Sequence, residues 1–210
     1  MFADTERKLY PGAGDPLTGK LDLDSHRWLR GEREESYSDW LAWIIERQDD
    51  ASRVLRLFGV EALADAHEEL TVRREVCISD GRPDLVIRHS SLNVLCVEVK
   101  TKSLPREGQL QDYVKWLAGV GSQLDLVLLA VDQPEDEPLP EHCRFCSWRQ
   151  VSLGLRAWAS GWLPDRQYDA VMTLAFCGAV ERNLLSMGGG GLRAVRTADY
   201  LEEVLGDVQT

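Results

Sequence analysis

Two charged side chains interrupt an otherwise apolar stretch, Val94-Leu95-Cys96-Val97-Glu98-Val99-Lys100-Thr101, near the middle of the 210-residue chain. The stretch is rich in β-branched residues, which predicts a strand that is buried on both faces. Glu98 and Lys100 are two residues apart, so their side chains leave the same face of that strand. Because isolated charges are costly to bury, we expect the pair to contact each other, a metal ion or an open cleft.

Asp84 is a third charged residue that the predicted fold brings toward Glu98. It lies early in the run from Pro83 to Arg88, which a Ser-rich turn joins to the strand of Glu98. Antiparallel pairing across that turn places Asp84 roughly opposite Glu98. Two carboxylates and a main-chain carbonyl, such as that of Val99, are hard oxygen ligands suited to Mg²⁺ or Mn²⁺. Such an ion activates water and polarises phosphoryl groups, and Lys100 could orient that water, help to deprotonate it or stabilise developing charge.

These residues resemble the motif of the PD-(D/E)XK nuclease superfamily. The motif reads here Pro83-Asp84, then Glu98-Val99-Lys100. Gln109 and Tyr113 match the QxxxY motif of the recombination-exonuclease branch, and at i and i+4 they share one helix face. Upstream, the predicted opening helix looks like that of an uncharacterised bacterial subgroup, in which an acidic residue joins the metal site. Glu35 is the residue that matches it.

The resemblance covers roughly residues 35–131 and implies a restriction-endonuclease-like core. This core is α/β, with a mixed central β-sheet flanked by helices in α-β-β-β-α-β order. The implied function is divalent-metal-dependent hydrolysis of phosphodiester bonds in DNA, in bacterial defence or DNA processing, with Mg²⁺ or Mn²⁺ as cofactor. The implied catalytic residues are Asp84, Glu98, Lys100, Gln109 and Tyr113, and the implied metal ligands are Glu35, Asp84, Glu98 and Val99.

Other interpretations of the same residues stay open at this point. Asp84 could cap the preceding turn, Glu98 and Lys100 could be a structural pair, and Gln109 and Tyr113 could be ordinary helix-surface residues. For the whole chain, the alternative is a catalytically silent nuclease-fold module that binds nucleic acid or assembles with a partner protein.

Apolar periodicity predicts the helices that must surround the strands. The first begins near Ser38, with Ser36 or Ser38 as its N-cap, and the second runs through 53–58 after a cap at Asp49 or Asp50. Further helices are expected at 61–69, 109–117, 150–160, 168–185 and 197–208.

Five strands are predicted, at 70–79, 83–88, 92–101, 124–131 and 143–148. The first three should form an antiparallel meander with a tight turn at Asp80-Gly81. A helix separates the third strand from the fourth, so these two should be parallel, and the fifth should lie at an edge. Alternation places Val72, Val76 and Ile78 on one face of the first strand.

Length and composition indicate one globular domain, since 44% of the residues are hydrophobic and 28% are charged. Residues 1–25 are rich in turn formers and are expected to form a loose arm. Residues 26–210 then form a single nuclease-like domain with a helical extension from about 150, whose helices are candidates for a homodimer or partner interface. The chain lacks an apolar run of about 18 residues, so no membrane contact is expected. Five cysteines, an odd number without a regular spacing, favour reduced thiols and a cytoplasmic location.

The net charge of −11 argues against a broadly basic surface that coats nucleic acid. Residues 70–120, however, contain eight basic and six acidic side chains, which leaves −13 for the rest of the chain. Any phosphate-binding face is therefore expected in this middle third, together with the motif residues.

Overall fold

The computed structural model describes residues 29, 33–60, 70–88, 93–120, 123–134, 138–162 and 165–185. The arm expected at 1–25 and the helices expected at 61–69 and 197–208 lie outside the described residues. Within the described residues, no helix is both long enough and apolar enough to cross a membrane.

Five strands form one mixed sheet, in which the spatial order follows the order along the chain. The strands are β1 (Thr71–Arg74), β2 (Leu85–Arg88), β3 (Asn93–Val99), β4 (Gln123–Ala130) and β5 (Cys143–Ser147). β1, β2 and β3 pair antiparallel, whereas β3, β4 and β5 pair parallel. The predicted meander, the parallel pairing of the third and fourth strands and the edge position of the fifth are confirmed.

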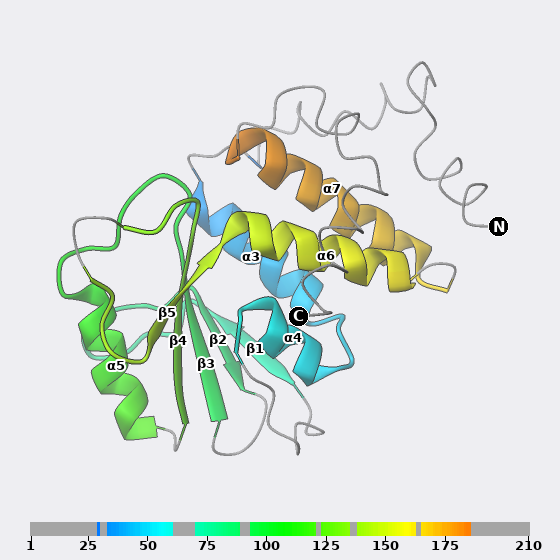
Figure 1. Ribbon diagram of the computed structural model, residues 1–210. Coiled ribbons are helices and arrows are strands. Elements are labelled where there is room, and N and C mark those ends of the chain that lie inside the picture. Colours follow the sequence, from blue (N-terminus) through cyan, green and yellow to red (C-terminus); the bar gives the residue numbers. More distant parts are fainter. Residues whose placement is uncertain are drawn as a thin grey trace, which may run out of the picture.

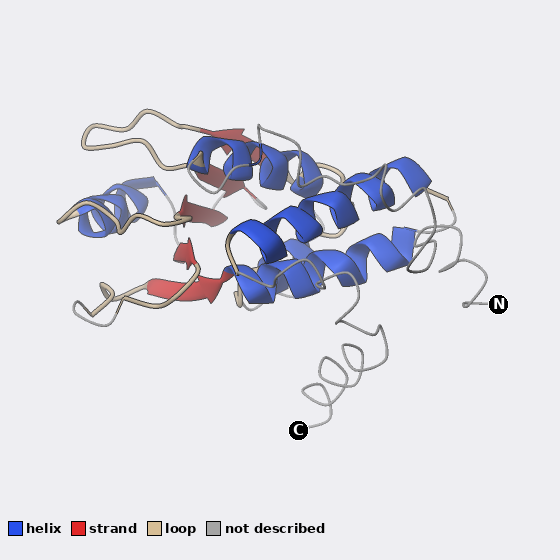
Figure 2. Cartoon of the chain, turned by 90° about the horizontal axis from the view of Figure 1, so that it is seen from above, coloured by secondary structure: helices blue, strands red, loops and turns tan. Residues whose placement is uncertain are grey.

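Helices cover both faces of this sheet, in three layers (Figures 1 and 2). Of the helices that the structure describes, one covers one face, α5 (Gln109–Val120). The other four cover the opposite face: α3 (Glu34–Ile45), α4 (Ala51–Leu57), α6 (Trp148–Trp162) and α7 (Gln167–Asn183). The molecule is therefore an α/β fold with a thin helical layer on one side and a thick one on the other.

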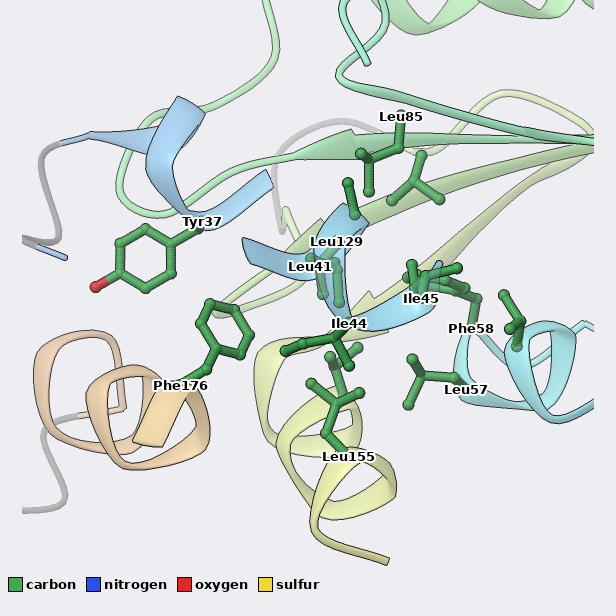
Figure 3. Close-up of a cluster of buried hydrophobic side chains, with 14 of the residues drawn as sticks. Tyr37, Leu41, Ile44, Ile45, Leu57, Phe58, Leu85, Leu129, Leu155 and Phe176 are labelled. Atoms are coloured by element: carbon green, nitrogen blue, oxygen red, sulfur yellow. The ribbon is translucent and has the colours of Figure 1, made fainter. Parts of the chain in front are cut away.

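Side chains alternate between the two faces of each strand and therefore pack into two separate hydrophobic clusters. On β3, Leu95 and Val97 point into the larger cluster under the four helices, while Val94 and Cys96 point into the smaller cluster under α5. Figure 3 shows the larger cluster, in which residues of α3, α4, α6 and α7 meet the sheet. Glu98 follows the even-numbered set, so its side chain leaves the sheet on the side of α5.

The first helix begins earlier than the sequence predicted. Its N-cap position is Arg33, which makes no side-chain capping bond, and Ser36 and Ser38 lie inside the helix. The Ser38 hydroxyl donates to the carbonyl of Glu35 at 3.0 Å instead of capping the helix. For the second helix, one of the two predicted caps is confirmed, because the Asp50 side chain accepts from the Ser52 N–H at 2.9 Å.

The hairpin between β1 and β2 also differs from its prediction. The strands stop pairing at Arg74, and Glu75 adopts a left-handed φ of 48°. The connection is closed farther on by a bridge between Ile78 and Gly81, which places Ser79 and Asp80 at the turn, one residue earlier than expected.

The change of backbone direction at Glu75 breaks the two-residue alternation of the first strand. Val72 packs against the larger cluster, whereas Val76 and Ile78 pack against the smaller one. The prediction that all three share one face is therefore wrong. This irregular connection instead extends toward α5 and reaches the residues described next.

Candidate functional site

Asp84 and Glu98 meet at one end of the sheet. Leu85 pairs with Val97 in the antiparallel ladder, so the residues that flank this pair, Asp84 and Glu98, are also opposite each other. The Val99 N–H donates to Asp84 Oδ2 at 2.8 Å, which holds Asp84 against the end of β3. The two carboxyl groups are close enough that each affects the pKa of the other. Asp84 therefore does more than cap the preceding turn, because its side chain binds the end of β3.

Lys100 lies between two acidic side chains. Its Nζ is 2.8 Å from Glu98 Oε1 and 3.3 Å from Glu34 Oε2. Only 12% of the Lys100 side chain is exposed. The Lys100 carbonyl accepts from the Trp148 indole N–H at 2.8 Å, so the first residue of α6 anchors the backbone at this point. Glu98 and Lys100 therefore share a face, as their spacing predicts.

The acidic residue of α3 that reaches the site is Glu34 and not Glu35. Glu34 Oε1 accepts from the Thr101 N–H at 3.1 Å and from the Ser103 hydroxyl at 2.6 Å. Glu35 is exposed. Successive helix residues point about 100° apart, so a shift of one position moves a side chain off the site. The assignment to Glu35 is corrected, and an acidic residue at the first helical position was the available signal for Glu34.

Gln109 and Tyr113 extend the site onto α5. Gln109 Nε2 donates to Glu98 Oε1 at 2.8 Å and to the Tyr113 hydroxyl at 2.9 Å. Gln109 Oε1 accepts from the Arg106 N–H at 2.9 Å, so the amide is fixed on both sides. Tyr113 is only 1% exposed, which rules out the interpretation as an ordinary surface residue.

Tyr113 is packed tightly against the irregular hairpin connection. A Cβ atom at Gly81 would lie 2.8 Å from Tyr113 Cε1, closer than real Cβ contacts allow. A backbone hydrogen bond from Arg82 also reaches the Tyr113 hydroxyl. The shifted turn at Ser79 and Asp80 therefore places Gly81 where the tyrosine ring requires a glycine.

The site holds more negative than positive charge. Burial, and then the neighbouring Asp84 charge, raise the pKa of Glu98 to about 7 against the opposing effect of Lys100. Burial also raises the pKa of Asp84. Glu98 Oε2 is buried and accepts no hydrogen bond from the residues that the structure describes. An ionised Asp84 cannot donate to it, so a proton or a cation is needed between the two carboxylates.

The site keeps Lys100 protonated. Burial alone would lower the pKa of Lys100, but the charges of Glu98, Glu34 and Asp84 outweigh burial and raise it. Glu34 is held ionised in spite of burial, because hydrogen bonds from Ser103 and Thr101 and the Lys100 charge lower its pKa. The ammonium group of Lys100 is therefore a positive charge held among these carboxylates.

The donor set fits a divalent ion that retains much of its water. No group of three His, Cys, Asp or Glu side chains able to hold a metal occurs within the described ranges. Mg²⁺ does not require one, because it is often bound through one or two carboxylates, water and substrate phosphate. Asp84 and Glu98 supply two carboxylates and an unsatisfied oxygen. Val99 contributes its N–H to Asp84, and the role predicted for its carbonyl stays a prediction.

The arrangement of Asp84, Glu98 and Lys100 must be interpreted from its own chemistry. Comparisons with protein-family models, with curated proteins and with solved structures find no match to this chain.

Proposed function

We propose that this protein is a divalent-metal-dependent nuclease that hydrolyses phosphodiester bonds in DNA and acts in the cytoplasm. The observation that carries the proposal is the convergence of Asp84, Glu98 and Lys100 at one end of the sheet. The order of the elements supports it, because α3, the antiparallel meander of β1 to β3, α5 and the parallel strand β4 follow the order of the restriction-endonuclease-like core, with α4 as an additional helix between α3 and β1.

Asp84 and Glu98 would hold the metal ion. When bound, such an ion polarises the phosphoryl group and lowers the pKa of water. The excess of negative charge supports this role, since burial and then the Asp84 charge raise the pKa of Glu98, and a cation near Glu98 Oε2 would offset both effects. Gln109 fixes the orientation of Glu98 Oε1 through a contact of 2.8 Å.

Lys100 would stabilise the negative charge that develops on the phosphate during hydrolysis. Its ammonium group is kept protonated by three neighbouring carboxylates, so it is suited to electrostatic stabilisation. Glu34 Oε2 contacts this ammonium group at 3.3 Å, and its other oxygen accepts hydrogen bonds from Thr101 and Ser103. Glu34 is therefore assigned as a positioning residue for the lysine.

The test compares DNA cleavage by the wild type, Asp84→Asn and Lys100→Ala with Mg²⁺, with Mn²⁺ and with EDTA. Cleavage should need the divalent ion and should fall by at least about 10³-fold in both variants, as expected when charge stabilisation at a reacting phosphate is lost. Glu46→Gln, at the exposed C-cap of α3, and Arg53→Ala, at an exposed position of α4, are matched charge-removing controls, and both should cleave like the wild type.

The effect of Mn²⁺ on the melting temperature, which does not depend on catalysis, distinguishes the nuclease from the catalytically silent module. Mn²⁺ should raise the melting temperature of the wild type at pH 8 but not that of Asp84→Asn, since an ion that binds only the folded state stabilises it. If Asp84→Asn cleaves DNA as fast as the wild type, the assignment is wrong. If the wild type neither cleaves DNA nor responds to Mn²⁺, the silent nucleic-acid-binding or assembly module is favoured.

A further inference from the structure

The loop of residues 101–108 joins β3 to α5, and site residues hold both of its ends. Its first part is held by Glu34, which accepts from the Thr101 N–H and the Ser103 hydroxyl. Its last part is held by Gln109, whose Oε1 accepts from the Arg106 N–H and whose own N–H donates to the Arg106 carbonyl at 2.9 Å. The same two side chains contact Lys100 and Glu98, so hydrogen bonds link the loop to the site at both of its ends.

Leu104 occupies the middle of this anchored loop and is unusually exposed. Its exposed fraction is 70%. In the described part of the chain, the other exposed large hydrophobic residues are Tyr168, at 69%, and Val120, at 37%. Pro105 follows directly and restricts Leu104 to an extended backbone conformation. Exposing a leucine gives no stability to the folded chain, whereas a fixed loop loses little entropy when the leucine contacts a ligand.

Charge around Leu104 identifies the chemistry of that ligand. Lys102 and Arg106 flank it, and both are exposed on the loop. Arg106 is 66% exposed and keeps a contact of 3.5 Å with Asp112 on α5. An apolar tip between two cations is complementary to a nucleic-acid strand, which offers apolar base faces between phosphates.

We propose that the loop of residues 101–108 binds an unpaired stretch of nucleic acid next to the site, with Leu104 against an unstacked base and Arg106 on a neighbouring phosphate. The proposal rests on the proposed function, because it takes the phosphate at Asp84 and Glu98 to belong to the same strand. It goes further in naming the substrate class as single-stranded or locally unpaired nucleic acid. In a fully paired duplex both faces of each base are stacked, so Leu104 could cover a base face only after a base step is unstacked, which costs free energy.

The experiment measures binding of the full-length protein to a short fluorescein-labelled oligothymidylate in EDTA, where no cleavage is expected. Leu104→Ala should weaken binding about tenfold, which corresponds to the loss of one partly buried leucine contact. Tyr168→Ala removes an equally exposed hydrophobic side chain from α7 and should bind like the wild type. A blunt duplex of the same length should lose much less affinity with Leu104→Ala.

Arg106→Ala tests the phosphate contact separately. Removal of one phosphate contact should reduce the slope of log K against log salt concentration by about 0.7 for a single strand. Arg53→Ala, a half-exposed cation of α4, should leave that slope unchanged.

The outcomes distinguish this inference from the proposed nuclease. If Leu104→Ala binds the oligonucleotide like the wild type, or if the wild type does not bind it, the inference is overturned. An equal loss of affinity for the duplex overturns the assignment to an unpaired base. If binding depends on Leu104 but Asp84→Asn still cleaves, or the wild type never cleaves, the nuclease proposal fails and the binding loop stands.

Discussion

Two buried glutamates, Glu98 at the end of β3 and Glu181 in α7, have opposite electrostatic surroundings. They are almost equally buried, at 2% and 5% exposure. Both oxygens of Glu181 are satisfied, by a bidentate contact with Arg156 at 2.7 and 2.6 Å and by the Ser152 hydroxyl at 2.7 Å. Glu98 has donors on Oε1 only, while its buried Oε2 accepts nothing within the described structure and a second acid lies beside it.

The difference separates a balanced ion pair from a cluster of side chains with an excess of negative charge. In the α6–α7 contact one guanidinium balances one carboxylate, and the geometry is the strong bidentate form. At the sheet end one ammonium faces three carboxylates, those of Glu98, Glu34 and Asp84. Functional sites are where such unbalanced groups are kept, because the substrate or ion completes them. The contrast predicts different responses to removing charge from each cluster.

The largest effect on stability is expected from Arg156→Leu. This variant leaves Glu181 buried without its cation, which should lower the free energy of unfolding by about 3–5 kcal/mol, measured by urea denaturation at pH 7. The double variant Arg156→Leu with Glu181→Leu removes both charges and should recover most of the loss. A cost below about 1 kcal/mol for Arg156→Leu would show that the pair is not a buried structural contact.

Glu98→Gln is expected to change the free energy of unfolding less than Arg156→Leu does, and in the opposite direction. The glutamine keeps an acceptor for Lys100 and Gln109 and presents an N–H group toward Asp84 in place of the unsatisfied oxygen. It should therefore stabilise the protein at pH 8 while abolishing cleavage. A variant that gains stability and loses activity is expected where a charged side chain serves catalysis and destabilises the folded state.

The pH dependence of this gain follows from the pKa of Glu98. The folded pKa is about 7, above the ordinary value of 4.5, so the folded state binds more protons than the unfolded state between these values. Stability contributed by the protonated form is therefore complete below about pH 4.5 and is lost as the pH rises through 7. Relative to Glu98→Gln, the wild type should lose about 1–3 kcal/mol between pH 5 and pH 8. A difference that stays constant with pH would contradict the assigned surroundings of Glu98.

The parts of the site that the sequence predicted correctly depend on the short side-chain repeats of strands and helices, which relate residues two or four positions apart. Glu98 and Lys100 share a face because strand side chains alternate, and Gln109 reaches Tyr113 because a helix brings i and i+4 together. The mixed sheet followed in the same way from apolar runs and from the helix between two of them.

The parts that the sequence missed depend on contacts between distant segments. Glu34 is selected over Glu35 by the amide of Thr101 and the hydroxyl of Ser103, more than 60 positions away along the chain. The early start of α3 has the same cause, since that contact holds its first turn. The shifted hairpin turn depends on the left-handed φ of Glu75, a conformation for which glutamate has no preference. Arg156 and Glu181 meet only through the packing of two helices.

The smallest effect that tests the contrast is expected from Tyr113→Phe, which removes a neutral group from the edge of the site. The hydroxyl accepts from Gln109 Nε2 and receives a backbone hydrogen bond from Arg82. Its loss should lower the free energy of unfolding by about 0.5–1.5 kcal/mol and slow cleavage a few-fold, because Gln109 keeps its contacts with Glu98 and Arg106. Burial raises the pKa of Tyr113 to about 12, so this loss should not change between pH 5 and pH 9.

Tyr168→Phe is the matched control for the hydroxyl deletion, since Tyr168 is 69% exposed on α7 and the change should be within about 0.5 kcal/mol of zero. A pH-dependent loss in Tyr113→Phe would mean that the hydroxyl takes part in the proton sharing between Asp84 and Glu98. The group of side chains that shares protons would then extend past Gln109 to Tyr113, one turn farther along α5. If the loss in the free energy of unfolding is the same at every pH, the groups that share protons are Asp84, Glu98 and Lys100 alone. The neutral amide of Gln109 then separates these charged groups from Tyr113.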